Sequence, residues 1–234
     1  MKRIITIFAV MAIVSMALQA EDFIVKSLKG KAKVRHGVME TWSAVSVGDT
    51  LKPEDTILTE GGSTMVIVKS AAIRYSIPEA SMLDVADLRN LSQDELLLRL
   101  AMENIKSVPI QQRPNDINVP NTTIVHGDDI SKDAEALKLP RTEVGSLQMH
   151  GVEVLYDNSF YASGILKSKA LIRLFPEARD EFTFRYQLAK AFEQVNLYDE
   201  ALTEYVSLSQ QSLAKEQKAK LDKTIQQLKS RKEQ

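Results

Sequence analysis

The pattern of hydrophobic and polar residues changes twice along the chain. Residues 4–18 are almost wholly apolar, residues 23–85 carry short alternating runs, and from about residue 144 the apolar residues recur with a helical period. The alternating runs are rich in β-branched residues and are separated by glycine and proline. The pattern predicts an α+β chain of several domains, with a small all-β domain over residues 21–88 and α-helical hairpins over residues 143–234.

Individual elements can be placed within this outline. Three alternating runs predict strands, over residues 31–35, 64–68 and 73–77. Ser92-x-x-Glu95 is a capping box, and the apolar residues after it predict one helix within residues 89–107, which ends before Pro109. Helical periodicity predicts five more helices, over residues 144–156, 160–175, 181–194, 198–211 and 214–229.

The segment between the two regular parts has the composition of a linker. Residues 108–142 hold four of the seven prolines, among Asn, Asp, Gln and Thr. So long a stretch with few apolar residues is uncommon inside a compact domain. We therefore expect a Pro-rich linker here and two separable domains, of which residues 143–234 fold alone.

The apolar opening segment is typical of a secretory signal peptide. Lys2 and Arg3 precede the apolar run, and Ala20 ends a small-residue cleavage site before Glu21. Residues 1–20 are therefore predicted to be removed on export to the periplasm, with a retained anchor helix as the alternative. The chain has no cysteine, which excludes disulfides, thiol catalysis, cysteine-bound zinc and a lipoprotein anchor.

Charge gives little sign of a nucleic-acid partner. Cleavage after Ala20 leaves 28 basic residues against 31 acidic ones, a net charge of −3. No later apolar stretch approaches the roughly 20 residues that a membrane-spanning helix needs. We expect no nucleic-acid binding and no integral membrane span after signal cleavage.

The β region resembles the FecR domain. The matching residues are Gly30-Lys-Ala-Lys-Val34, Trp42, Val47-Gly48-Asp49-Thr-Leu51, Asp55-Thr-Ile57-Leu-Thr59 and Gly62-Ser-Thr-Met-Val66. The chain departs from the family pattern at Glu54, where the second Gly-Asp turn has glycine, and at residues 69–72. The resemblance implies an envelope ligand such as a glycan. FecR itself is similar to a transmembrane signal transducer that acts with a sigma factor.

Within this region four residues have candidate roles. Gly48 can adopt the positive φ of a tight turn, and Asp49 and Asp55 can cap their own turns, so all three are predicted to form turns. Trp42 could stack on a sugar ring, or it could be a core residue of the β domain. Both interpretations of Trp42 stay open.

The helical region resembles a tetratricopeptide repeat. The resemblance rests on five predicted packing residues, Leu188, Ala189, Phe192, Ala201 and Tyr205. It departs from the repeat at Arg185, where a bulky aromatic is usual, and at Leu213, where proline is usual. The preceding helical pair looks like a degenerate copy in which Gly151 and Gly164 permit close crossing. The resemblance implies a protein partner, and an ordinary helical bundle is the alternative.

Catalytic and metal-binding patterns are weak. His36, His126 and His150 are isolated, and His126-x-Asp128-Asp129 lacks the regular acidic spacing of a calcium loop. No cofactor motif occurs, and only a cluster of acids with perturbed pKa values in a cleft would favour an enzyme. We therefore predict an exported, non-enzymatic binding or scaffold protein of the bacterial cell envelope. The alternative is a component of a FecR-type envelope signalling system that acts through a membrane partner.

Overall fold

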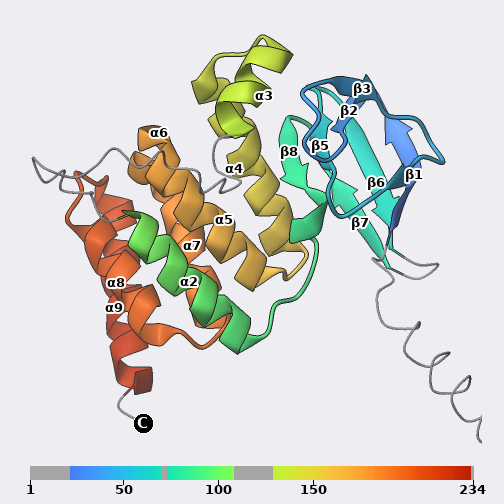
Figure 1. Ribbon diagram of the computed structural model, residues 1–234. Helices are drawn as coiled ribbons and strands as arrows, with labels where there is room; N and C mark the ends of the chain where they lie inside the picture. The colour runs from blue at the N-terminus through green and yellow to red at the C-terminus, as the bar shows by residue number, and fades with distance from the viewer. Residues whose placement is uncertain (1–21, 70–72, 108–128, 233–234) are drawn as a thin grey trace, which may run out of the picture.

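The computed structural model describes residues 22–69, 73–107 and 129–232 (Figure 1). The predicted signal peptide, residues 1–20, and most of the predicted linker, up to residue 128, lie outside these ranges. The described part is an α+β structure, with two small antiparallel sheets in its N-terminal region and helices in its C-terminal part.

The N-terminal region is built from short strands. Their bounds are β1 Phe23–Lys29, β2 Ala32–Arg35, β3 Trp42–Ala44, β4 Thr50–Leu51, β5 Thr56–Thr59, β6 Thr64–Val68, β7 Arg74–Ile77 and β8 Ser81–Asp84. One sheet has the order β4-β1-β6-β7 and the other the order β3-β2-β5-β8, with antiparallel pairing throughout. The strands predicted over 31–35, 64–68 and 73–77 correspond to β2, β6 and β7.

The two sheets share one apolar core. Val25 of β1, Val34 of β2 and Ile57 of β5 are buried in it, together with Met65, Ile67 and Ile77 of the first sheet. Strand alternation divides the second sheet into two faces. Ile57 and Leu83 point into this core, whereas their neighbours Leu58 and Met82 belong to a different cluster with residues of the helices. The β3-β2-β5-β8 sheet is therefore covered on both faces.

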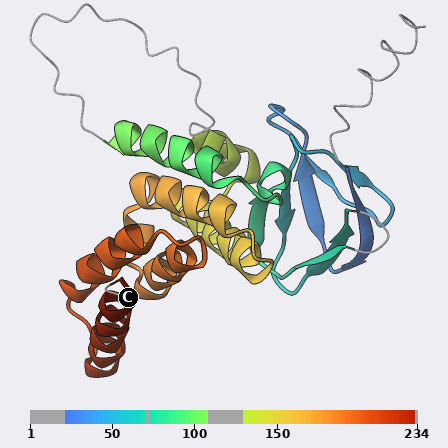
Figure 2. The same ribbon diagram turned by 90° about the horizontal axis from the view of Figure 1, so that it is seen from below.

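Helices make up the rest of the described chain. Their bounds are α2 Gln93–Ser107, α3 Asp129–Leu137, α4 Arg141–Asp157, α5 Tyr161–Leu174, α6 Pro176–Asp180, α7 Phe182–Gln194, α8 Tyr198–Ser209 and α9 Lys215–Lys232. A 3₁₀ turn, Val85–Asp87, follows β8 directly. Figures 1 and 2 show α4 beside the sheet, α5 beside α4, and α7 to α9 farther from the sheet.

The helical part packs directly on the β part. Gly151 of α4 lies so close to β8 that an added Cβ would fall 1.9 Å from the carbonyl oxygen of Met82. Val154 and Leu155 of the same helix, with Phe160, are buried in the core that the two sheets share. The two predicted domains therefore have a joint core, and the expectation that residues 143–234 are a separable unit does not match these contacts.

Three further differences from the predicted elements have physical reasons. The range predicted as linker, 108–142, contains α3, because Ala134 and Leu137 pack on the helical cluster and stabilise a short helix. Pro176 begins the one-turn α6, since proline is tolerated in the first turn of a helix. Gly164 does meet Tyr156 of α4 at a helix crossing, but Gly151 meets a strand where a helix was expected.

Candidate functional site

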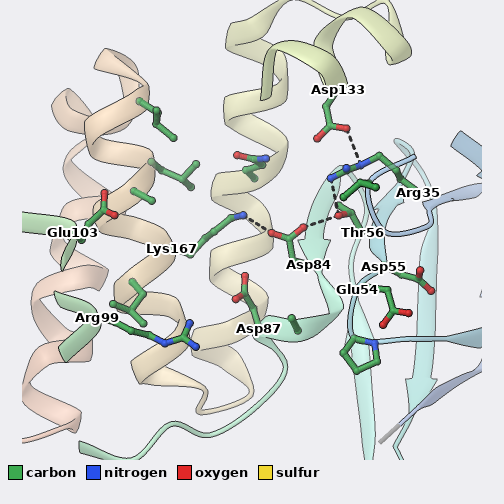
Figure 3. A pocket seen from close by; sticks show the side chains of 18 of the residues that line it. Arg35, Glu54, Asp55, Thr56, Asp84, Asp87, Arg99, Glu103, Asp133 and Lys167 are labelled. Atoms are coloured by element: carbon green, nitrogen blue, oxygen red, sulfur yellow. Dashed lines mark hydrogen bonds and ion pairs between the residues drawn. The ribbon is translucent and has the colours of Figure 1, made fainter. Parts of the chain in front are cut away.

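A hollow of the described structure lies where the second sheet meets the helices. This junction cavity has a volume of about 450 Å³. Its lining includes Arg35, Thr56, Asp84 and Asp87 from the β side and Gln148 and Lys167 from α4 and α5. In Figure 3, Asp84 and Asp87 both point towards Lys167, while Arg99 and Glu103 of α2 lie farther along the wall.

The polar residues on the sheet side are aligned by strand register. Arg35 of β2 pairs with Thr56 of β5, and Thr56 pairs with Asp84 of β8. Residues directly opposite in an antiparallel sheet point to the same face. The row therefore emerges on the face of the sheet that α4 and α5 cover, and Trp42 of β3 continues it beyond Arg35.

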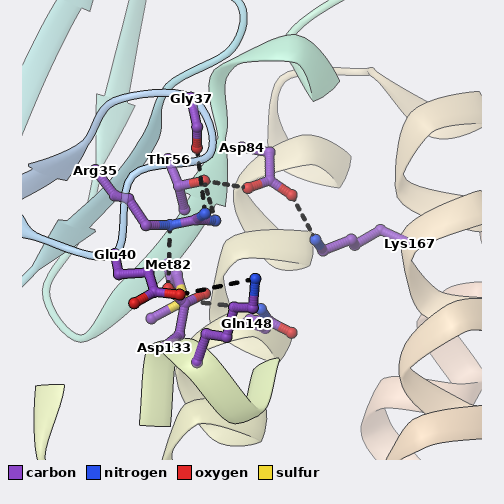
Figure 4. Close-up of polar contacts among 10 residues, drawn as sticks. Arg35, Gly37, Glu40, Thr56, Met82, Asp84, Asp133, Gln148 and Lys167 are labelled. Atoms are coloured by element: carbon purple, nitrogen blue, oxygen red, sulfur yellow. Dashed lines mark hydrogen bonds and ion pairs between the residues drawn. The ribbon is translucent and has the colours of Figure 1, made fainter. Parts of the chain in front are cut away.

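These residues form a continuous chain of hydrogen bonds and ion pairs from α3 to α5 (Figure 4). Arg35 forms an ion pair with Asp133 of α3, in which Nε lies 3.1 Å from Oδ1, and Arg35 Nη2 donates to Thr56 Oγ1 at 3.1 Å. The Thr56 hydroxyl donates to Asp84 Oδ1 at 2.7 Å, and Lys167 Nζ donates to Asp84 Oδ2 at 2.6 Å. The chain ties two helices to three neighbouring strands.

The central pair is held in its charged form. Burial by itself raises the pKa of Asp84, but the Lys167 ammonium, the Thr56 hydroxyl and the Arg35 charge together hold it below its ordinary value. Burial lowers the pKa of Lys167, yet the charges of Asp84 and Asp87 raise it well above its ordinary value. Both oxygens of Asp84 are occupied, so this carboxylate has a structural role.

The pKa of Asp87, unlike that of Asp84, is raised. Burial raises its pKa to about 6, and the neighbouring charge of Asp84 adds to that effect, while Lys167, Arg89 and Arg99 oppose it. No ion pair or side-chain hydrogen bond is seen for the Asp87 carboxyl within the described residues. At neutral pH it is therefore mostly an unpaired carboxylate on the cavity wall.

Acidic groups outnumber basic ones around the cavity. Five basic residues line it, and each has an acidic partner: Arg35 with Asp133, Lys167 with Asp84, Arg173 and Lys106 with Glu103, and Arg99 with Glu95. Glu54 and Asp87 line the cavity without such a partner in the described part of the chain. The surplus charge of the lining is negative.

A buried amide adds a second unsatisfied group. Gln148 of α4 lines the cavity with 7% of its surface exposed, and its Oε1 has no hydrogen-bond partner. Its Nε2 lies 3.7 Å from the sulfur of Met82, a weak acceptor. Because buried polar atoms are nearly always satisfied in native proteins, either a water molecule or a group of a ligand would donate to this oxygen.

Ion pairs also connect the helices that line the cavity. Arg173 of α5 donates to Glu103 of α2 at 2.5 Å, and Glu103 is only 8% exposed. The predicted capping box begins α2, where the Glu95 backbone amide donates to Ser92 Oγ at 3.2 Å. The Glu95 side chain pairs instead with Arg89 and Arg99, at 2.7 and 2.9 Å.

Trp42 lies beside this site and is half-buried. Its ring packs against the cluster that contains Leu58 and Met82, and the Arg35 guanidinium lies 6.0 Å from the ring centroid. The indole Nε1 is buried without a partner. These contacts favour the packing interpretation of Trp42 over a sugar-stacking surface, because one face of the ring is already occupied.

The predicted turn residues lie at turns, and they are not in the cavity's polar chain. Gly48 has φ +97°, and the Ser46 amide donates to Asp49 Oδ2 at 2.7 Å. Asp55 accepts from the Lys52 amide at 2.8 Å and lies 3.0 Å from His36 Nδ1. His150 Nδ1 lies 2.9 Å from the carbonyl oxygen of Ala80, so this histidine is also engaged in a structural contact.

The predicted packing residues of the repeat lie away from the cavity. All five are buried in the cluster formed mainly by α5, α7, α8 and α9, namely Leu188, Ala189, Phe192, Ala201 and Tyr205. Tyr205 donates from its hydroxyl to Glu193 at 2.6 Å. Arg185, at the departure from the repeat pattern, pairs with Glu204 of α8 at 2.6 Å.

Sequence reasoning missed the residues of the cavity. Arg35 ends the predicted strand over 31–35, and Thr56 follows Asp55 in the stretch that resembles the FecR pattern, but the sequence assigned neither residue a role in a site. Charged or hydroxyl-bearing residues within a strand that alternates towards a buried face are the available signal. Lys167 lies 83 residues after Asp84, and no local pattern links such positions.

Neither a metal site, nor a membrane-spanning helix, nor a similar known protein assigns a function to the described residues. Within the described ranges, no group of three or more His, Asp or Glu side chains is arranged to hold a metal ion. His126 and Asp128 lie outside those ranges. None of the described helices is long and apolar enough to cross a lipid bilayer. No family model, curated protein or solved structure matches the chain.

Proposed function

We propose that this is an exported, non-enzymatic binding and scaffold protein of the bacterial cell envelope, and that its junction cavity binds a small ligand bearing a primary amine. The observation that carries the proposal is the unpaired carboxyl of Asp87 in a cavity whose five basic side chains all have acidic partners. An ammonium group would pair with Asp87, and the unsatisfied Gln148 Oε1 in the same lining could accept a further hydrogen bond from the ligand.

The size and place of the cavity support binding. A volume of about 450 Å³ lies within the range of small-molecule sites, and such sites occur preferentially where two structural units meet. An amino sugar or a lysine-containing peptide has this amine chemistry, and both are of a size that fits. The former agrees with the envelope glycan that the FecR resemblance implies.

Binding accounts for the cavity better than catalysis does. Two carboxyl groups with separated pKa values, such as Asp84 and Asp87, are the pattern of an acid–base pair. Asp84, however, has one oxygen on Thr56 and the other on Lys167. A carboxylate so engaged is not available as a base or nucleophile.

The remaining parts of the proposal rest on the sequence resemblances. The β region is proposed as a FecR-like domain, and α7 with α8 as a tetratricopeptide-like pair that contacts a protein partner. Full burial of Ala189 and Ala201, one on each helix, supports that pairing, because small residues allow two helices to approach closely. Residues 1–20 are proposed as the export signal, which places the chain in the periplasm.

The experiment measures thermal stability against amine concentration. Glucosamine and a lysine-containing dipeptide are the two probes, and their N-acetylated forms are matched controls that lack the charge. We expect both amines, or one of them, to raise the melting temperature at pH 7.5, since a ligand that binds only the native state stabilises it. The acetylated forms should have no effect, and Asp87→Asn should abolish the shift.

The outcome separates the alternatives. A melting shift with N-acetylglucosamine equal to that with glucosamine would mean that charge does not select the ligand, and the amine proposal would fail. A shift that persists in Asp87→Asn would move the site away from this cavity. Release of a new product from either probe would instead favour an enzyme.

A further inference from the structure

The junction cavity has a second carboxyl group besides Asp87 that faces no partner, that of Glu54. Glu54 lies in the turn between β4 and β5, where the next residue, Asp55, accepts the hydrogen bond of the turn from the Lys52 amide. Its Cγ lies 3.9 Å from the ideal Cβ position at Gly37, which also lines the cavity. The side chain is exposed and has no ion pair or hydrogen bond to the described residues. Its charge is therefore available to a ligand.

Strand pairing brings Glu54 to the same end of the sheet as Asp87. β5 and β8 are antiparallel, and just beyond their paired residues the Val85 amide donates to the Asp55 carbonyl oxygen at 2.9 Å. Glu54 immediately precedes this contact and Asp87 follows it. In Figure 3, Glu54 lies on the sheet side and Asp87 lies nearer to Lys167. Two negative charges without partners in one cavity repel each other, and a ligand with two positive charges removes that repulsion.

The same lining has a large apolar share. Six of its residues are Val38, Pro53, Ala86, Leu166, Ala170 and Leu171, which come from both the sheet side and α5. Val38 is 82% exposed, so this side chain has most of its surface open to a ligand. The walls therefore suit a chain of methylene groups, because such a chain needs no hydrogen-bond partners along its length.

An observation independent of the two carboxyl groups also points to a bound donor. Gln148 is 7% exposed, lines the cavity, and its Oε1 has no hydrogen-bond partner. A primary ammonium group has three N–H donors, so it can pair with a carboxylate and still donate to an amide oxygen. The lining thus offers acceptors for more than one ammonium hydrogen.

We propose that the ligand of the junction cavity has two primary ammonium groups joined by a short apolar chain, one group at Asp87 and the other at Glu54. This rests on the proposed amine site and selects among amines. Alkyl diamines belong to the class, and so does a lysine-containing peptide with a free N-terminus. An amino sugar does not, because it has a single ammonium group and brings hydroxyl groups to apolar walls.

A neighbouring hollow supplies the competing class of ligand. It shares Glu54 with the junction cavity and is lined also by His36 and Lys52. His36 Nδ1 lies 3.0 Å from Asp55 and is engaged there, whereas Lys52 presents a positive charge. A ligand with a carboxylate at its far end would pair with Lys52, and a ligand with a second ammonium group pairs with Glu54. ε-Aminocaproate, which has one amine and one carboxylate, is therefore the competing probe.

Calorimetric titration with matched probes tests the proposal. Putrescine, cadaverine and hexamethylenediamine are each compared with the alkyl monoamine of the same chain length, at low ionic strength. At least one diamine should bind about two- to fivefold more tightly than its monoamine, which is the gain expected from one exposed ion pair. High salt should remove this preference, because it screens exposed charges. ε-Aminocaproate should bind more weakly than hexylamine, since its carboxylate meets Glu54.

Variants assign the preference to its residue. Glu54→Gln should abolish the diamine preference and leave the Kd of the monoamine unchanged, while Asp87→Asn should abolish binding of both. The turn should tolerate Glu54→Gln, because Asp55 makes its hydrogen bond. Glu200→Gln, at an exposed position of α8 outside the cavity lining, is the matched control and should keep the preference.

The outcomes separate this inference from the proposed function. Monoamine binding that needs Asp87, with diamines no tighter or with a preference that persists in Glu54→Gln, would overturn the diamine class and leave the amine site standing. Tighter binding of ε-aminocaproate than of hexamethylenediamine would overturn it in favour of a carboxylate at Lys52. Absence of binding by every amine, glucosamine included, would overturn the amine site and the diamine class together.

Discussion

Several buried charged residues of this protein form ion pairs that cross between elements. Arg185 of α7 is 8% exposed, donates to Glu204 at 2.6 Å and lies 3.1 Å from the hydroxyl of Ser207. In the sequence resemblance to a tetratricopeptide repeat it stands where a bulky aromatic is usual, and here it forms a buried ion pair between α7 and α8. The residue pattern could show that an aromatic is missing, but not which acid compensates for the arginine.

Removing one member of this pair should be costly. Glu204→Gln leaves the Arg185 guanidinium buried without its counter-charge, and we expect the free energy of unfolding to fall by about 3–5 kcal/mol. The double variant Arg185→Leu with Glu204→Leu should lose less, because it leaves no buried guanidinium without its counter-charge; Lys169, which also pairs with Glu204 at 3.2 Å, is the more exposed of the two cations. Urea denaturation of the three proteins measures the difference. A Glu204→Gln variant as stable as the parent would show that solvent reaches this pair.

Asp87 should make stability depend on pH. Its pKa is about 6 in the folded chain against an ordinary 3.8, so the native state binds the extra proton between these values. The contribution of Asp87 to stability is therefore favourable below about pH 4 and is lost as the pH rises through 6. Asp87→Asn should stabilise the protein by about 1–3 kcal/mol at pH 8 and by almost nothing at pH 4. Chemical denaturation at the two pH values tests this, and an equal gain at both would contradict the assignment.

At the scale of elements, the sequence predicted the long helices, in which apolar residues recur over several turns of the same element. The five helices from α4 to α9 other than α6 were placed to within a few residues, because their apolar residues recur over several turns. The short α3 and α6, and strands β1, β3, β4, β5 and β8, were not placed individually. Each is short, with at most four apolar positions, and packs on neighbours from elsewhere in the chain. The cavity was not predicted either, because its walls come from strands and helices that are far apart in sequence.

At Gly151, α4 approaches β8 very closely. Gly151→Ala adds a methyl group where the carbonyl oxygen of Met82 already lies, at 1.9 Å from the ideal Cβ position. The helix must move away from the strand, and we expect a loss of about 1–3 kcal/mol in the free energy of unfolding. Ser146→Ala, on the exposed side of the same helix, is the control and should change stability by less than about 0.5 kcal/mol.

The packing of α7 on α8 can be tested in the same way. Ala189 and Ala201 are both fully buried, so Ala189→Leu or Ala201→Leu should overpack the cluster and cost about 1–3 kcal/mol. Capture of a protein partner from the envelope should weaken in both variants if the pair is tetratricopeptide-like. Exposed Lys218 on α9 serves as the control, and Lys218→Ala should change stability by less than about 0.5 kcal/mol. An Ala201→Leu variant that melts like the parent would contradict the tetratricopeptide-like pairing.

At the scale of the whole molecule, the two predicted domains share buried clusters. Composition correctly separates a β part from a helical part, but it cannot show that the second sheet is covered on both faces. Leu58 and Met82 are buried with Val144 and Val152 of α4, and Val154 and Leu155 of the same helix are buried with the residues between the two sheets. The polar chain from Asp133 to Lys167 crosses the same boundary. A shared core of this kind makes each part depend on the other for stability.

Unfolding should therefore be a single transition. Trp42, the one tryptophan in the chain, reports on the β part, while circular dichroism at 222 nm reports mainly on the helices. We expect the two signals to change at the same denaturant concentration, because the shared core is lost at once. Residues 143–234 made alone should melt at a lower temperature and less cooperatively than the full chain, since Val154 and Leu155 become exposed. Two separate transitions, with a fragment as stable as the helical part of the full chain, would show that the linker joins independent domains.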